Sequence, residues 1–304
     1  MARTPLCILV VVASSFVCSG RSRESSDVSN CSSTSIQVDI ASTCGEPATV
    51  RALPFKLYAG YLVVVEGRIG AVEKLKFVLD TGVIHSVVDQ KVAKKLRLQR
   101  HSAQVLNFNR TIAIERAIFP DVQFGPVQVR NPSMLIADLA HFSDFATHAD
   151  ALIGMDLLSL SNFTIDNDAK NVLFDPLDRV VSAAALNTDP VAMTAELLLQ
   201  NHPLRLIVDT GLQGVLLYAE RVRKRIPELR VEDESEVDIG GRMRAKQMTV
   251  PNARLGPTEM ALTIWLVNGP PENVLPGIDG FLGTASLKAR RIKFNFATNT
   301  LSWE

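Results

Sequence analysis

Between about residue 49 and the end of the chain, apolar residues fall into short runs separated by Gly, Pro and Asn. Runs such as Leu62 to Val65 and Leu204 to Val208 have the length and the β-branched content typical of strands. Two stretches, Gln90 to Leu96 and Ala219 to Ile226, instead place apolar residues three or four positions apart. They predict helices, and Pro227 ends the second one. The pattern therefore predicts a mainly β protein with few helices.

The same elements occur twice along the chain. Asp80-Thr81-Gly82 recurs as Asp209-Thr210-Gly211, 129 residues later. The apolar segment Leu152-Ile153-Gly154 recurs at the same offset as Phe281-Leu282-Gly283. An offset that is conserved over such a distance indicates an internal duplication of a unit of about 125 residues.

We expect four segments: a signal peptide at residues 1–20, a flexible leader at 21–48, and two small barrel-like β lobes at 49–178 and 179–304. The first has a basic start, a short apolar run and small residues at its end, as secretory signal peptides have. The leader is rich in Ser and has few large apolar residues. These features predict an exported protein, periplasmic or secreted. The apolar run is too short to span a bilayer, so we expect no stable membrane insertion after its removal.

The cysteines bear on a lipid anchor, a disulfide and a metal site. Val17 is bulkier than the small residue expected before a lipidated cysteine, which disfavours a lipid anchor on Cys18. Cys31 and Cys44 then remain, and they predict one disulfide, with two free thiols as the alternative. A zinc site would need more ligands at closer spacing, so we expect no metal and no other cofactor.

Charged residues balance, with 32 Lys and Arg against 32 Asp and Glu, which is not typical of a nucleic-acid-binding protein. The basic residues of the two predicted helices are interpreted as solvated faces. In the second helix these are Arg221, Arg223, Lys224 and Arg225.

Each Asp-Thr-Gly triplet follows an apolar run, which as a buried strand would place the carboxylate at its end. A single triplet would be weak evidence, because it arises by chance in about one chain in fifteen of this size. An ordinary turn is the alternative for either triplet alone. Two copies with the same flanking strands favour a pair of matched functional loops.

At this point the sequence resembles the retropepsin-like aspartic peptidases. The resemblance rests on Phe77-Val78-Leu79-Asp80-Thr81-Gly82, Ser86-Val87-Val88, Leu152-Ile153-Gly154-Met155-Asp156 and their partners in the second half. It implies a bilobal aspartic-protease architecture in a monomer, with one catalytic aspartate from each lobe. The residues that it assigns are Asp80 and Asp209 as the catalytic pair, and Thr81, Gly82, Thr210 and Gly211 as supports of the active-site loops.

The chemistry implied is the hydrolysis of peptide bonds in peptides or unfolded proteins. Two close carboxyls share one proton, the charged one activates a water, and the protonated one donates to the scissile carbonyl oxygen. The family also covers its substrate with β-hairpin flaps, for which we assign Phe108 and Asn109 in lobe one and Gly240 and Gly241 in lobe two.

One departure from the family pattern concerns the residue after each triplet. Val83 and Leu212 stand where Ser, Thr or Ala is usual, so no hydroxyl stabilises the ionised carboxylates and the pKa values should be higher. The sequence therefore predicts an exported aspartic endopeptidase with a less acidic working range. The alternative is an inactive peptide-binding module with the same fold.

Other titratable residues suggest competing sites. His85 lies close to Asp80, and a second cluster comprises His141, Asp144, His148 and Asp150. We set aside a serine-type triad because no nucleophile motif accompanies His85. We set aside a metal site because the second cluster lies in a predicted loop with no helix to fix its spacing.

Overall fold

The computed structural model describes residues 11–13, 51–107, 110–139, 148–174, 182–189, 192–227, 229, 232–239, 243–270 and 275–304. Within them the protein is mainly β, as the sequence predicted. The helical elements are α1 (Gln90–Leu96), α2 (Met155–Leu158), α3 (Ala219–Arg225) and the 3₁₀ helix η2 (Thr284–Leu287). The helix α1 has the predicted bounds, and α3 ends one residue earlier than predicted.

Strands make up most of both halves. Those of the first half are β1 (Val11–Ala13), β2 (Arg51–Tyr58), β3 (Leu62–Ile69), β4 (Val72–Leu79), β5 (Val87–Asp89), β6 (His101–Asn107), β7 (Arg110–Ile118), β8 (Val122–Phe124), β9 (Val127–Val129), β10 (Ser133–Ala137), β11 (Ala151–Ile153), β12 (Phe163–Asp166) and β13 (Asn171–Phe174). Those of the second half are β14 (Ser182–Asp189), β15 (Ala192–Leu199), β16 (His202–Asp209), β17 (Val215–Tyr218), β18 (Glu232–Ile239), β19 (Met243–Leu255), β20 (Thr258–Val267), β21 (Gly280–Gly283), β22 (Arg291–Asn295) and β23 (Thr300–Trp303).

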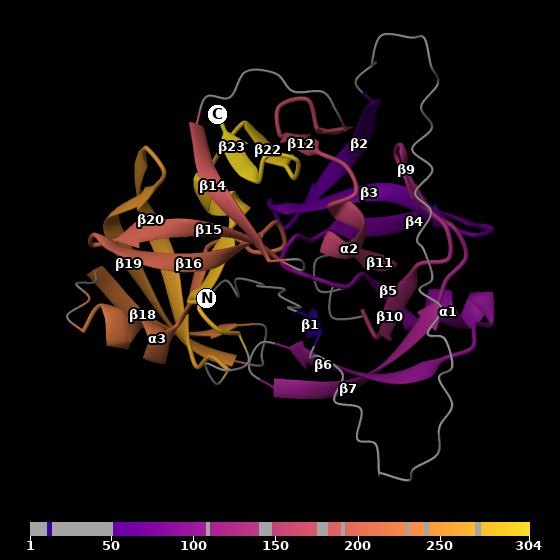
Figure 1. The fold of residues 1–304 in the computed structure, drawn as a ribbon, viewed down its shortest axis with the longest axis horizontal. Helices are drawn as coiled ribbons and strands as arrows, with labels where there is room; N and C mark the ends of the chain where they lie inside the picture. Colours follow the sequence, from indigo (N-terminus) through magenta and orange to yellow (C-terminus); the bar gives the residue numbers. More distant parts are fainter. Residues whose placement is uncertain are drawn as a thin grey trace, which may run out of the picture.

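The two halves form lobes with the same order of paired strands. In lobe one, neighbours run β2-β3-β4-β11-β5-β10-β7-β6. In lobe two they run β14-β15-β16-β21-β17-β20-β19-β18, matching lobe one strand by strand. Figure 1 shows lobe one in indigo to magenta on one side and lobe two in orange on the other. An internal duplication requires such a match and remains a prediction from the sequence.

The centre of each lobe explains the apolar-apolar-Gly segments. Strand β11 runs parallel to β4, with Leu152 opposite Val78, and antiparallel to β5. Strand β21 lies in the same way between β16 and β17. A strand with neighbours on both sides and protein on both faces is apolar throughout, and Ala151, Leu152 and Ile153 are fully buried. This packing fixes the end of β4, where Asp80 follows.

A shared sheet joins the two lobes. Its six antiparallel strands run in the order β2-β13-β12-β22-β23-β14, so that each lobe contributes three. In the view of Figure 1, β12, β22 and β23 lie together at the top between the lobes. Phe163 of β12 is paired with Phe294 of β22, and their stacked rings are 4.6 Å apart between centroids. Both side chains are buried, so the lobes share one apolar core here.

The side chain of Arg221 contradicts the prediction of a solvated helix face. Only 6% of Arg221 is exposed. Its guanidinium lies 5.0 Å from the ring centre of Tyr218. It also donates hydrogen bonds to backbone oxygens of the loop before β21, namely those of Pro270, Leu275 and Ile278. A basic residue that satisfies several carbonyls can replace water for them, which is why burial of this charge is tolerated.

Several predicted features fall outside the described residues. Cys31 and Cys44, the leader, and most of the predicted signal peptide are among them. Within the predicted signal peptide, Val11–Ala13 form β1, which pairs antiparallel with β6. In the part of the chain that the structure describes, none of the helices has the length and apolar character to cross a bilayer.

The apolar core at the shared sheet leads to a prediction about the free energy of unfolding. Phe294→Ala should lower the free energy of unfolding by about 3–5 kcal/mol, because it removes a buried ring and its stacking contact with Phe163 in the common core. Urea denaturation measures this. The control is Ile118→Ala, since Ile118 is 56% exposed and should change stability by less than about 0.5 kcal/mol. Equal effects of the two substitutions would contradict the role of the shared sheet.

Candidate active site

The structure brings Asp80 and Asp209 together. Asp80 directly follows β4, and Asp209 is the last residue of β16, the matching strand of lobe two. Their carboxyl groups lie within hydrogen-bonding reach of each other. The exposed fractions are 3% for Asp80 and 1% for Asp209. Two residues that are 129 positions apart in the sequence therefore form one buried acidic pair.

Thr81 and Thr210 hold the two loops together by reciprocal hydrogen bonds. The hydroxyl of Thr81 donates to the backbone oxygen of Val208 (2.8 Å) and accepts from the backbone NH of Thr210 (3.1 Å). The hydroxyl of Thr210 donates to the backbone oxygen of Leu79 (2.7 Å) and accepts from the NH of Thr81 (3.0 Å). Four bonds in a buried place thus connect the lobes directly beside the aspartates.

Gly82 and Gly211 let the two loops approach each other. A Cβ on Gly82 would overlap the carboxyl group of Asp209, and a Cβ on Gly211 would lie 2.6 Å from a carboxyl oxygen of Asp80. Each glycine also donates its backbone NH to the aspartate of its own loop, Gly82 to Asp80 at 3.0 Å and Gly211 to Asp209 at 2.7 Å. Any side chain at either position would therefore separate the pair.

Val83 and Leu212, the departures from the family pattern, both have fully buried side chains. Val83 packs in an apolar cluster of lobe one that includes Val78 and Leu152. Leu212 packs in a separate cluster of lobe two with Trp265 and other apolar residues. These side chains contribute to the cores beneath the loops and offer no hydroxyl to the carboxylates.

Burial raises the pKa of both aspartates. Burial is the largest cause for Asp80, whose pKa is well above its ordinary value, and the facing Asp209 raises it further. Burial raises the pKa of Asp209 to about 6, against the hydrogen bonds from Gly211 and Asp80, which lower it. The effect expected from the sequence, a further rise because Val83 and Leu212 carry no hydroxyl, stays a prediction. The two groups titrate as a pair that gives up its two protons in separate steps.

Two further residues of this region received no role in the sequence analysis. Ser86 and Asp156 are hydrogen-bonded to each other beside the loop of Asp80. Both lie within the segments that carry the family resemblance. The sequence did contain one sign of them. Val215 and Ala285 stand at the matching positions of lobe two, so the polar pair is a feature of lobe one alone.

The residues that were set aside do not converge on a second site. Nδ1 of His85 is 4.0 Å from a carboxyl oxygen of Asp156, and Nε2 of His148 is 4.0 Å from one of Asp150. Within the described ranges, no three His, Cys, Asp or Glu side chains are grouped as metal ligands would be. His141 and Asp144 lie outside those ranges, as do the flap residues Phe108, Asn109, Gly240 and Gly241.

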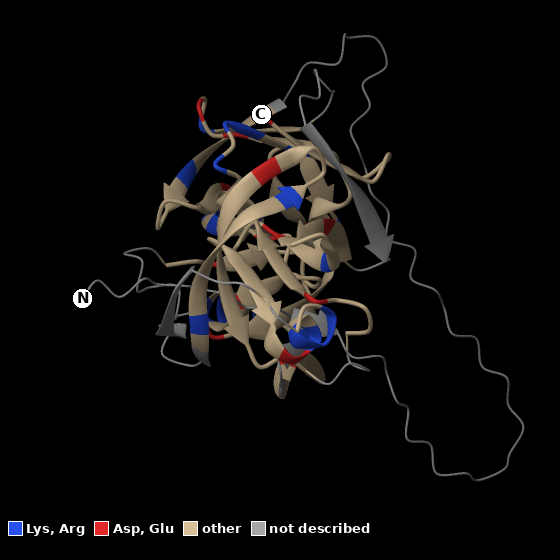
Figure 2. Cartoon of the chain, turned by 90° about the vertical axis from the view of Figure 1, so that its left-hand side faces the viewer, with Lys and Arg blue, Asp and Glu red and all other residues tan. Residues whose placement is uncertain are grey.

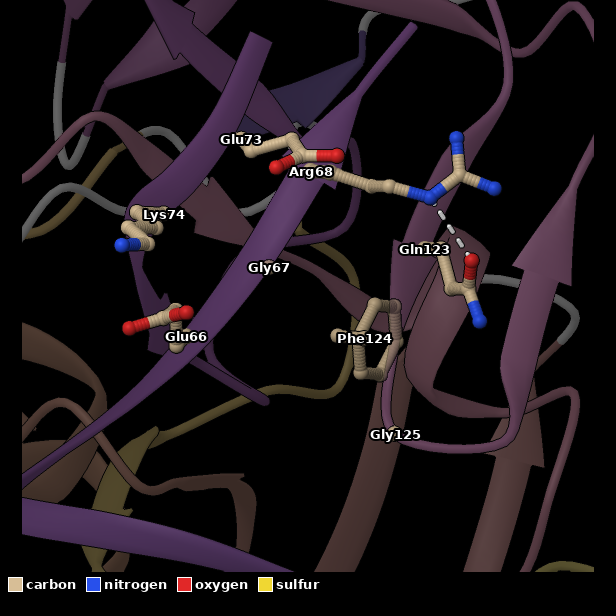
Figure 3. A pocket seen from close by; sticks show the side chains of 8 residues that line it. All are labelled: Glu66, Gly67, Arg68, Glu73, Lys74, Gln123, Phe124 and Gly125. Carbon is tan, nitrogen blue, oxygen red and sulfur yellow. Dashed lines mark hydrogen bonds between the residues drawn. The ribbon is translucent and has the colours of Figure 1, made fainter. Parts of the chain in front are cut away.

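A hollow on lobe one lies far from the acidic pair. Its lining is mainly charged and polar, and Arg68 at its edge donates to the side chain of Gln123 at 2.8 Å (Figure 3). Lys74, which also lines it, is six residues before Asp80 along β4, or roughly 20 Å in an extended strand. This hollow therefore takes no part in the chemistry of the pair.

Comparison with known families agrees with the geometry. Residues 65–157 match the family model for aspartyl proteases, a segment that includes Asp80 and ends within α2. For this segment, the match confirms the predicted resemblance to the retropepsin-like aspartic peptidases, and it supports a protease-like function. No curated protein matches the chain.

The threonine bonds predict a difference between two similar substitutions. Thr81→Val keeps the shape but leaves the NH of Thr210 and the oxygen of Val208 without partners, so it should cost about 2–4 kcal/mol of unfolding free energy. Thr81→Ser keeps the hydroxyl and should cost about 1 kcal/mol for the lost methyl group. Urea denaturation compares the two, and equal losses would contradict the importance of these bonds.

The raised pKa values predict that the pair costs stability at neutral pH. Because the folded-state pKa of Asp209 is about 6 and the ordinary value is 3.8, its contribution to stability is lost as the pH rises between these values. The variant Asp209→Asn carries no charge at any pH. Relative to the wild type, its unfolding free energy should increase by on the order of 3 kcal/mol between pH 4 and pH 8.

Urea denaturation at pH 4 and at pH 8 measures this change. The control is Glu73→Gln, which removes a carboxylate that is exposed on lobe one. A pH-dependent change of the same size in both variants would contradict burial as the cause.

Proposed function

We propose that this protein is an aspartic endopeptidase that hydrolyses peptide bonds with a water activated between Asp80 and Asp209. The observation that carries the proposal is the buried pair of carboxyl groups, which two crossed threonines hold together from both lobes. Aspartates in ordinary turns would be solvated and would lack this shared environment. The family match covers only lobe one, so the contribution of lobe two rests on the geometry.

The roles of the two aspartates follow from their protonation. Asp209 has the lower pKa of the pair and accepts a hydrogen bond from Asp80. In the proposed reaction the ionised Asp209 takes a proton from the water, and the water oxygen attacks the carbonyl carbon of the scissile bond. The protonated Asp80 donates to the carbonyl oxygen. Collapse of the tetrahedral intermediate returns a proton to the leaving nitrogen and breaks the C–N bond.

An extended peptide fits the strand arrangement of lobe one. Strand β6 lies at the end of the order of paired strands in lobe one, and the short strand β1 pairs with it, Val11 opposite Asn107. The backbone groups of this edge can thus bond to an additional antiparallel strand, as a peptide substrate would. Acidic and basic residues are interspersed on the side of lobe two that Figure 2 shows, in agreement with the balanced charge of the sequence.

Export and the monomeric state belong to the same proposal. The basic start and apolar run before residue 20 support export to the periplasm or the medium. One chain carries both aspartates, so a single copy suffices for the site. The second candidate function is an inactive peptide-binding module, which Val83 and Leu212 favour because neither supplies the usual hydroxyl.

Incubation of the protein with a peptide library and with a denatured protein across pH tests the proposal. We expect cleavage that a statine-type inhibitor blocks. The ratio kcat/KM should rise as the pH increases through about 6, where the pair loses its first proton, and should fall again at higher pH.

The variants Asp80→Asn and Asp209→Asn should each lose at least about 100-fold in kcat. Glu73→Gln serves as the control with an intact pair. Cleavage that survives either aspartate substitution would overturn the two-aspartate mechanism, and a maximum in strong acid would overturn the raised pKa values. Tight binding of peptides without cleavage would favour the binding module.

A further inference from the structure

The loop that begins with Asp80 lies against the segment that joins β11 to α2. At one end, the backbone NH of Asp80 donates to the oxygen of Ile153 at 3.0 Å. At the other end, the NH of Asp156 donates to the oxygen of Ile84 at 3.0 Å. Between them, a Cβ on Gly154 would lie 2.6 Å from a backbone oxygen of the loop. The position of Asp80 therefore depends on how closely these two segments fit.

The side chains of Ser86 and Asp156 join the two segments a second time. The backbone NH of Ser86 lies 2.9 and 3.0 Å from the two carboxyl oxygens of Asp156. The hydroxyl of Ser86 donates to the same carboxyl at 2.5 Å and accepts from the NH of Gly154 at 2.9 Å. Ser86 is fully buried, so water does not replace these bonds. Partial burial raises the pKa of Asp156, and the bonds from Ser86 oppose this rise.

The surroundings of Ser86 do not fit a catalytic nucleophile. The hydroxyl of Ser86 is directed to Asp156 and has no exposed surface, so no substrate can reach it. Nδ1 of His85, which is partly exposed, lies 4.0 Å from a carboxyl oxygen of Asp156. With no access for substrate, the remaining role for the pair is to hold the loop.

Lobe two has no equivalent of this pair. Val215 and Ala285 stand at the positions that match Ser86 and Asp156, and neither side chain can form a hydrogen bond. At the position that matches His85, a Cβ on Gly214 would overlap the ring of Trp265. Apolar packing therefore supports the loop of Asp209, whereas a polar pair supports the loop of Asp80.

We propose that Asp156, acting through Ser86, is a positioning residue that orients the carboxyl group of Asp80 toward the scissile carbonyl; this rests on the proposed function. The side chains of the pair form hydrogen bonds with each other and with Gly154. Its loss should misplace the proton donor while leaving the substrate-binding strands intact. We expect kcat to fall by up to about 100-fold with KM unchanged.

The experiment is a double-mutant cycle with Ser86→Ala, Asp156→Ala and the double variant, assayed for kcat and KM. If the two residues act as one unit, the double variant should be no slower than the worse single variant. Asp156→Asn keeps an oxygen acceptor for the NH of Ser86 and should recover part of kcat. Additive losses, a rise in KM alone, or no rescue by Asn would overturn the proposal.

The matched control is Ser286→Ala in lobe two, which removes a hydroxyl bonded only locally, to the backbone oxygen of Gly283 at 2.5 Å. Its kcat should remain within about twofold of the wild type. An equal fall in kcat for this control would also overturn the proposal, because any lost serine would then have the same effect.

Amide hydrogen exchange gives a readout that does not require activity. In Ser86→Ala and Asp156→Ala, exchange should accelerate in residues 80–86, while residues 209–215 and the shared sheet keep their protection. Faster exchange throughout the molecule, or none at residues 80–86, would overturn the positioning role. If the wild type cleaves nothing but this selective acceleration occurs, the proposed peptidase function fails while the support of the Asp80 loop stands.

Discussion

Two carboxyl groups buried within hydrogen-bonding reach of each other are the constraint on which the surrounding structure depends. Such groups repel when both are ionised, and burial makes even one charge costly. The protein offsets this by crossing two threonine hydroxyls between the lobes and by keeping glycine where any side chain would push the carboxyls apart. The same repulsion leaves one proton on the pair, so the arrangement that costs stability also creates an acid beside a base.

The two lobes are alike in the Asp-Thr-Gly loops that meet at the acidic pair, and they differ in the residues that support these loops. The threonine bonds, the glycines and the order of strands are repeated, because both loops must approach a common centre. Behind the loops the chemistry differs: lobe one uses Ser86 and Asp156, whereas lobe two uses apolar packing under Trp265. Arg221, which fixes a loop of lobe two from a buried position, is another such difference.

Local sequence patterns were sufficient to predict the mainly β fold, the helix α1 and the strands that lead into each triplet, because these depend on apolar periodicity and on nearby turns. The repeated triplets also led to the aspartates that the structure brings together. The burial of Arg221 could not be predicted in this way, since its acceptors lie about 50 residues away in a loop. The bonds between Ser86 and Asp156, 70 residues apart, are equally non-local. The shared proton likewise depends on a distance that only the folded chain defines.

The six-stranded sheet has a consequence for how the site is assembled. Because β12 and β22 pair within one chain, the meeting of the two acidic loops is part of folding and requires no encounter between separate molecules. Dilution therefore cannot separate the halves, as it would separate two identical subunits. One chain with two copies of a loop can also change one copy and keep the other. Ser86 in lobe one and Val215 at the matching position of lobe two are an example. A symmetric pair of identical subunits could not carry such a difference.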